Sequence, residues 1–181
     1  HLFPLIDSNK CIKCSLCEFV CPIKNKYGLI KTPDNIKQNL VACFSKNDNV
    51  LKKSSSGGMF FTISSYLIKN GFVVYGSSFD NNLKLTLNRA SKIDELFKLC
   101  KSKYIQSKFD KYLEIKTILD SGWKVAVCAT PCQIAALKLF LRRDYKNLFT
   151  IDFICHGVPS QIYFDKYIEE ENKKNHIKIL D

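Results

Sequence analysis

Short apolar runs alternate along most of the chain with apolar residues spaced three or four apart, and glycines separate many of these blocks. Apolar or alternating runs predict strands at residues 72–75, 83–87, 125–128 and 148–154, with a further short strand at 40–44. Helical spacing predicts helices from 57 or 58 to about 69, over 93–99, 109–120 and 130–142, and from 160 to about 173. Because strands and helices alternate, we expect an α/β domain over residues 36–181, with a mostly parallel sheet flanked by helices. The chain ends soon after the last predicted helix, so we expect this domain to be truncated at its C-terminus.

Residues 1–35 carry a different pattern, a closely spaced run of cysteines that ends in Cys-Pro: Cys11, Cys14, Cys17, Cys21 and Pro22. The spacing C-x2-C-x2-C-x3-C-P is that of bacterial ferredoxins, whose thiolates hold a 4Fe–4S cluster. Zinc sites usually pair two C-x2-C units across a longer spacer or combine one with histidines, so zinc fits this run less well. We therefore predict a small ferredoxin-like iron–sulfur module over residues 1–35, and electron transfer as its role.

Two ligation schemes remain open for this run. All four cysteines could hold one local cluster. Alternatively, as in two-cluster ferredoxins, Cys21 could serve a second cluster while the other three share the first. The stretch Leu2–Ile6 reads as a strand that enters the cluster loop, and on the second scheme we expect an upstream half-motif to be missing.

Composition narrows the class of protein. A chain of 181 residues, 46% of them apolar, can bury a sizeable core, and its apolar stretches are too short for a membrane span, so we expect a soluble protein. Nine cysteines without an export signal favour the reducing cytoplasm. The net charge of +11 comes from lysines scattered along the chain, which argues against nucleic-acid binding. A basic surface still suits an acidic redox partner or a phosphorylated cofactor.

Two segments have the composition of ligand-binding loops. The first, Ser54–Gly58, leads directly into a helix, where paired glycines leave backbone amides open to a phosphate; a flexible linker is the alternative. The second, Ser102–Ser107, combines a cation, an aromatic ring and hydroxyls that could clamp a flavin; an ordinary surface loop is the alternative. The candidate binding residues are Ser56, Gly57, Gly58, Ser102, Lys103, Tyr104 and Gln106.

Two further segments follow predicted strands and begin helices. In the first, Thr130, Pro131 and Gln133 form the signature of a capping box, and Cys132 falls in the first helical turn, where the helix dipole favours a thiolate. A well-capped helix with an incidental cysteine is the alternative. In the second, Cys155 and His156 follow the next strand. Because ligands collect beyond the carboxyl ends of parallel strands, we expect Cys132 and Cys155 to face one crevice. His156 could donate a proton there or could be structural.

These motifs resemble, in order, those of the coenzyme F420 hydrogenase/dehydrogenase beta-subunit family. The resemblance rests on the cysteine run and on Ser55–Gly58, Ser102–Ser107, Thr130–Gln133 and Asp152–Ser160. It implies an iron–sulfur flavoprotein oxidoreductase that passes electrons between 4Fe–4S clusters, FAD and an organic substrate such as a deazaflavin. It also implies a redox partner subunit or a ferredoxin. On this basis the cofactor-binding set gains Thr130, Pro131, Cys132 and Gln133, and the catalytic candidates are Cys132, Cys155 and His156. These three residues could tune the flavin or contact the substrate, or they could instead supply extra cluster ligands.

The chain departs from the family pattern in two ways. Many members carry two cysteine runs, whereas this sequence has one, and members continue well past the Cys-His-Gly-Val-Pro-Ser segment. We therefore expect a fragment that lacks both ends and could be inactive alone. Two alternatives to the flavoprotein remain: a non-catalytic electron-wire or docking subunit, and a polysaccharide-biosynthesis-associated protein of the same fold.

Overall fold

The computed structural model describes residues 5–22, 24 and 39–175. At its centre is one mixed four-stranded sheet with the strand order β2-β1-β3-β4. The strands are β1 (Phe72–Phe79), β2 (Leu85–Ala90), β3 (Lys124–Cys128) and β4 (Leu148–Ile151). Strands β1, β3 and β4 run parallel, and β2 pairs antiparallel with the outer side of β1. The predicted α/β class and the mostly parallel sheet are confirmed.

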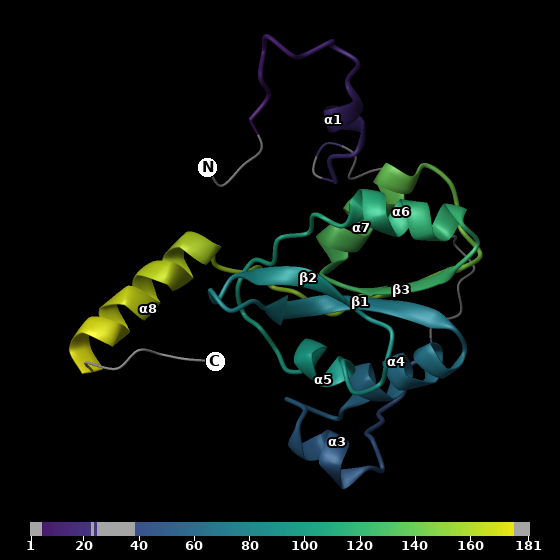
Figure 1. Cartoon of the computed structure of the whole chain (residues 1–181), viewed down its shortest axis with the longest axis vertical. Helices are drawn as coiled ribbons and strands as arrows, with labels where there is room; N and C mark the ends of the chain where they lie inside the picture. The colour runs from purple at the N-terminus through teal and green to yellow at the C-terminus, as the bar shows by residue number, and fades with distance from the viewer. Residues whose placement is uncertain (1–4, 23, 25–38, 176–181) are drawn as a thin grey trace.

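Helices cover both faces of the sheet (Figure 1). One face carries α4 (Met59–Lys69) and α5 (Leu96–Leu99), and the other carries α6 (Tyr112–Asp120) and α7 (Pro131–Leu141). The described chain also contains α1 (Leu16–Phe19), α3 (Asp48–Lys52) and α8 (Gln161–Asn175).

The alternation of side chains along each strand divides the core into two layers. On β1, Val74 packs with the apolar face of α4 and α5, while its neighbour Tyr75 packs with that of α6 and α7. On β3, Ala126 joins the first layer, whereas Val125 and Val127 join the second. All five of these residues are fully buried. Because the strands are buried on both faces, they read in the sequence as continuous apolar runs.

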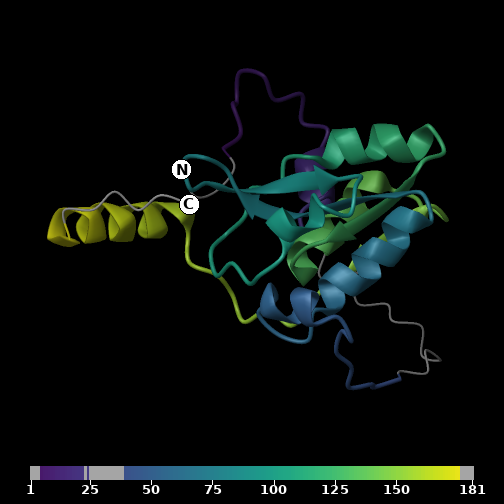
Figure 2. The same ribbon diagram turned by 60° about the horizontal axis from the view of Figure 1, so that its bottom comes forward.

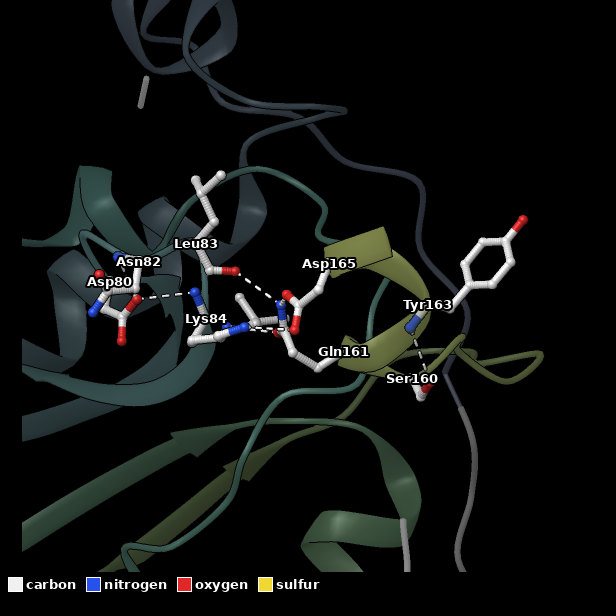
Figure 3. Close-up of polar contacts among 9 residues, drawn as sticks. Asp80, Asn82, Leu83, Lys84, Ser160, Gln161, Tyr163 and Asp165 are labelled. Atoms are coloured by element: carbon white, nitrogen blue, oxygen red, sulfur yellow. Dashed lines mark hydrogen bonds and ion pairs between the residues drawn. The ribbon is translucent and has the colours of Figure 1, made fainter. Parts of the chain in front are cut away.

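Helix α8 projects away from the body of the domain in both ribbon views (Figures 1 and 2). Its first turn is fixed to the turn between β1 and β2 (Figure 3). The Gln161 amide accepts a hydrogen bond from the Leu85 amide (3.1 Å) and donates one to the Leu83 carbonyl (3.0 Å), and Lys84 pairs with Asp165 at 2.5 Å. The rings of Phe79 and Phe164 stack beside these contacts, with centroids 5.9 Å apart.

Several predicted boundaries need correction, and the β1–β2 turn shows why. The second strand begins at Leu85, not at Leu83, because the Asp80 carboxylate accepts hydrogen bonds from the amides of Asn82 and Lys84 and holds a turn there. Within that turn Leu83 has a left-handed φ of 57°. The fourth strand ends at Ile151 and does not reach 154.

The helix predicted from Phe109 begins only at Tyr112. The preceding residues pair with the edge of β2 instead, because the Lys108 amide donates to the Leu85 carbonyl at 2.8 Å and its carbonyl accepts from Leu87. The helix predicted over 93–99 is shorter and spans Leu96–Leu99.

The strand predicted at Leu40–Phe44 is wrong. Leu40, Val41 and Phe44 are 70–97% exposed and join no sheet within the described residues, so the apolar run lacks the neighbour that a strand requires. The same connector contains α3, which the sequence reading missed although Asn47 caps it by accepting from the amides of Asn49 and Val50. Of the strand predicted at Leu2–Ile6, residues 2–4 lie outside the described residues, and Leu5 and Ile6 form no strand. Residues 23 and 25–35 also lie outside the described residues.

None of the helices in the described part of the chain combines the length and the apolar character that crossing a membrane requires.

Candidate functional site

The carboxyl ends of the parallel strands bring two predicted segments to one edge of the sheet. Strand β3 ends at Cys128 and leads into Thr130–Gln133, and β4 ends at Ile151 and leads into the segment that contains Cys155 and His156. The Ala129 amide donates to the Ile151 carbonyl at 3.1 Å and ties the two strand exits together. This edge is where ligands bind in open α/β sheets.

Residues 102–107, here called the linking loop, contact all three other motifs. The Ser102 amide donates to the Ser55 hydroxyl at 2.9 Å. The Gln106 amide donates to the Pro159 carbonyl at 2.9 Å, next to the Cys155–His156 segment. The side-chain amide of Gln133 donates to the Ser107 carbonyl at 3.1 Å and to its hydroxyl at 3.0 Å. Four segments that are far apart in the sequence therefore form one connected edge.

The predicted capping box forms at the start of α7. The Gln133 side-chain oxygen accepts from the Thr130 amide at 3.3 Å and from the Thr130 hydroxyl at 3.0 Å. Cys132 is exposed in the first turn, and its sulfur lies 3.2 Å from the Thr130 hydroxyl. Gln133 thus has two functions, because one end of its amide group caps α7 while the other end holds the linking loop.

Lys103 points inward and is half-buried. Its ammonium donates to the Leu99 carbonyl at 2.9 Å and to the Cys100 carbonyl, and burial lowers its pKa to about 8. Burial also raises the pKa of the nearby Cys128 thiol to about 11; the positive charge of Lys103 opposes this rise and Asp152 adds to it. Lys103, Cys128 and Asp152 therefore lie within electrostatic range of one another at the strand ends. The sequence reading missed Cys128 and Asp152, although both stand at carboxyl ends of strands, which is the signal that could have found them.

We predict that the Lys103 amine titrates near pH 8. Because its folded pKa lies below the ordinary value of 10.5, the unfolded chain binds more protons between about pH 8 and 10.5. The contribution of this residue to folding stability should therefore rise with pH across that window, and Lys103→Met should abolish the rise. Labelling with acetic anhydride, followed by mass spectrometry, should show half-maximal reactivity of Lys103 near pH 8. A midpoint in the ordinary lysine range would contradict the prediction.

The glycines before α4 pack against the chain itself. A side chain at Gly57 would lie 2.9 Å from the Cys43 carbonyl, and the Gly57 carbonyl accepts from the Ser45 amide at 2.7 Å. Gly58 is the N-cap of α4 with a φ of 72°, a conformation that other residues rarely adopt. The close approach predicted here thus involves residues 43–45, and the predicted role of Ser56, Gly57 and Gly58 in cofactor binding stays a prediction.

Several large apolar side chains are exposed beside this polar network. Tyr104 in the linking loop is 78% exposed, and Phe153 and Ile154, just after β4, are 51% and 90% exposed. His156 is exposed and Cys155 is half-buried. Across residues 5–22, 24 and 39–175, no three His, Cys, Asp or Glu side chains converge as a preformed metal site. The edge therefore presents polar donors, the half-buried cation of Lys103 and apolar surface, the mixture typical of sites for organic cofactors.

The cysteine run forms an open loop that ends in α1. Cys11, Cys14 and Cys17 are exposed and Cys21 is half-buried. Lys13 and Ser15 have left-handed φ angles of 54° and 56°, which curl the backbone between the first three cysteines.

Two features of this loop suit an anionic cluster. The Lys13 amide donates to the Cys11 sulfur at 3.4 Å, and hydrogen bonds of this kind tune iron–sulfur clusters. The Lys24 ammonium pairs with Glu18 at 2.5 Å and lies within electrostatic range of Cys17 and Cys21. The donor set and the local charge therefore fit a cluster held by this run.

Comparisons with known proteins agree with both parts of this arrangement. Residues 3–30 match the model of a 4Fe-4S binding domain, which confirms the predicted iron–sulfur character of this part of the chain, while the individual cysteine ligands stay a prediction. Residues 122–181, which contain β3, α7, β4 and the Cys155–His156 segment, match the family model for the C-terminal part of the coenzyme F420 hydrogenase/dehydrogenase beta subunit. These two matches support the resemblance to the coenzyme F420 hydrogenase/dehydrogenase beta-subunit family that the sequence motifs indicate.

A solved structure shares the fold of this chain. It is a chain from the F420-reducing [NiFe] hydrogenase complex of Methanosarcina barkeri, with a TM-score of 0.58 and 22% sequence identity. The match covers 72% of the present chain and 48% of that chain, so the present chain spans about half the length of this structural neighbour. A comparison with curated proteins gave no match.

Proposed function

We propose that the chain is the iron–sulfur and flavin part of an oxidoreductase subunit. It would pass electrons between a 4Fe–4S cluster, FAD and an organic substrate such as a deazaflavin. The observation that carries the proposal is the linking loop, whose residues hydrogen-bond to Ser55, Gln133 and Pro159 and so join all four motifs of the α/β domain. A set of distant segments held together at the carboxyl edge of a sheet is the arrangement expected of a cofactor site.

The residues at this edge suit the planar ring system and the phosphates of FAD. The exposed ring of Tyr104 and the side chains of Phe153 and Ile154 offer apolar surface to a planar ring system. The half-buried Lys103 supplies a positive charge close to that surface, and the first turn of α4, which no side chain among the described residues caps, supplies backbone amides that suit phosphates. When bound, a flavin exchanges single electrons with a cluster and a hydride with an organic partner.

The chain's own residues then have separable tasks. Cys11, Cys14, Cys17 and Cys21 would hold the cluster, and Gln133 and Ser107 would keep the linking loop in place. Cys132, Cys155 and His156 remain our candidates for direct contact with substrate or flavin, because all three lie on segments that leave the carboxyl edge. The structural neighbour belongs to an F420-reducing hydrogenase complex, which supports a deazaflavin as substrate and a second subunit as redox partner.

An anaerobic reduction experiment tests the proposal. The protein is reconstituted with iron, sulfide and FAD, reduced with dithionite, freed of excess reductant and mixed with coenzyme F420. We expect the deazaflavin to take up two electrons and a proton only when FAD has been bound, while ferricyanide accepts single electrons from either form. Reduction of ferricyanide but never of the deazaflavin would instead favour the electron-wire subunit.

A further inference from the structure

The edge of the sheet opposite the candidate site contains two adjoining hollows, of about 480 and 280 Å3. Both lie at the amino ends of the parallel strands, where the turns before β1, β3 and β4 meet. They share Gly122, in the turn between α6 and β3, and Lys124, the first residue of β3. No part of the carboxyl edge lines either of them, so they need an explanation of their own.

Basic and aromatic side chains dominate this edge. We define the amino-edge patch as Trp123, Lys124, Arg142, Arg143 and Lys146. Trp123 lines the smaller hollow and is 63% exposed, while Lys124, Arg143 and Lys146 line the larger. Exposed tryptophan and arginine are enriched where proteins bind one another.

The charge of this patch is only partly neutralised. Asp120 pairs with Lys116 and with Arg143, the latter at 2.6 Å, and Asp144 adds a second carboxylate. Among the ion pairs of the described residues, none involves Lys124, Arg142 or Lys146. With Lys116 counted, five basic residues at this edge face two acidic ones, so its net charge is +3.

The contacts of Lys124 are with neutral groups. Its ammonium donates to the Asn70 carbonyl and lies over the Phe72 ring, and neither contact supplies a negative charge. It therefore remains able to attract an anionic partner.

The patch adjoins the cysteine run. The Arg142 guanidinium lies 5.6 Å from the centre of the Phe19 ring, and Phe19 stands between Cys17 and Cys21. Figure 1 shows α1 on the side of the sheet that α6 and α7 cover. Since Cys11, Cys14 and Cys17 are exposed, a protein seated on the patch would lie close to the ligands of the proposed cluster.

We propose that the amino-edge patch is the docking surface for an acidic one-electron carrier protein of the ferredoxin kind. This inference rests on the iron–sulfur part of the proposed function. Opposite charge would steer the carrier to this edge, and Trp123 would pack against it. The carrier would then exchange electrons next to the cysteine run, while the carboxyl edge stays free for the organic substrate. Separate entry points would let both partners be bound at once.

Binding of a purified acidic 2Fe–2S ferredoxin to the full-length, iron-loaded chain tests this proposal. Isothermal titration calorimetry should show binding that weakens as salt rises from about 0.05 to 0.3 M, because salt screens exposed charges. The double variant K124E/K146E should bind at least about tenfold more weakly, a loss of about 1.4 kcal/mol. The matched control is K52E/K98E, which changes the net charge by the same amount. Both of its reversals lie away from the patch, on α3 and α5, which pack on the α4 face of the sheet.

The outcomes separate this proposal from the proposed function. If ferredoxin binding weakens equally in both double variants, the effect comes from overall charge, and the proposed docking surface is wrong. Absence of binding to the wild-type chain, or unchanged binding to K124E/K146E, would overturn it as well. Stronger competition by duplex DNA than by the ferredoxin would assign the patch to nucleic acid. In each case the iron and FAD contents, measured on the same samples, report on the proposed function independently.

Discussion

Replacement of Cys14 by alanine is expected to remove the 4Fe–4S cluster from the protein. Cys14 is the second thiolate of the run and stands between Lys13 and Ser15, whose left-handed backbone curls the loop. Loss of a ligand should lower iron content by at least about tenfold, because even an outer-shell partner contributes about 10- to 100-fold to metal affinity. Iron and acid-labile sulfide assays, with the visible spectrum of anaerobically prepared protein, measure the effect.

Cys43→Ala is the matched control for this variant. Cys43 is an exposed free thiol outside the run, so its loss should leave iron content unchanged. Cys21→Ala distinguishes the two ligation schemes. If one cluster is held locally, Cys21→Ala should lose as much iron as Cys14→Ala. A smaller loss of iron with a different visible spectrum would indicate that Cys21 serves a second cluster. Full iron retention in Cys14→Ala would contradict the assignment of the run.

Replacement of Gln133 by alanine is expected to lower FAD affinity by about tenfold or more, which corresponds to about 1.4 kcal/mol. The change removes both hydrogen bonds to Ser107 and the contacts that cap α7 at Thr130. Each neutral hydrogen bond contributes about 0.5–1.5 kcal/mol to stability, so the linking loop should lose its fixed position before the domain unfolds. Quenching of flavin fluorescence during titration with FAD gives the affinity.

Gln161→Ala provides the comparison. Gln161 also makes two hydrogen bonds to backbone groups, at Leu83 and Leu85, but it anchors α8 to the β1–β2 turn (Figure 3). We expect this variant to keep its FAD affinity and both variants to keep their iron. If the two glutamine variants lose FAD affinity equally, the loss reflects general destabilisation, and the linking loop has no special role.

Local signals in the sequence were sufficient for most helices and for the buried strands. The start of α7 was predicted to the residue, because Thr130, Pro131 and Gln133 act through contacts within one turn of helix. Strands β1 and β3 were recognisable because burial on both faces leaves an unbroken apolar run.

Features that depend on distant contacts were harder to predict. The apolar run at Leu40–Phe44 looks like a strand, but it has no neighbour to pair with within the described residues. The inward turn of Lys103 depends on carbonyls at Leu99 and Cys100 that only the fold presents to it. The hydrogen bond between Ser102 of the linking loop and Ser55 joins residues 47 positions apart, so no local pattern in the sequence predicts it.

The most direct measurement is the content of iron, acid-labile sulfide and FAD per polypeptide in protein purified without oxygen. We predict about four irons and four sulfides for each complete cluster. We also predict one flavin per chain, which can be extracted from the folded protein. Protein that contains neither iron nor flavin after anaerobic reconstitution, or that contains zinc alone, would contradict the account.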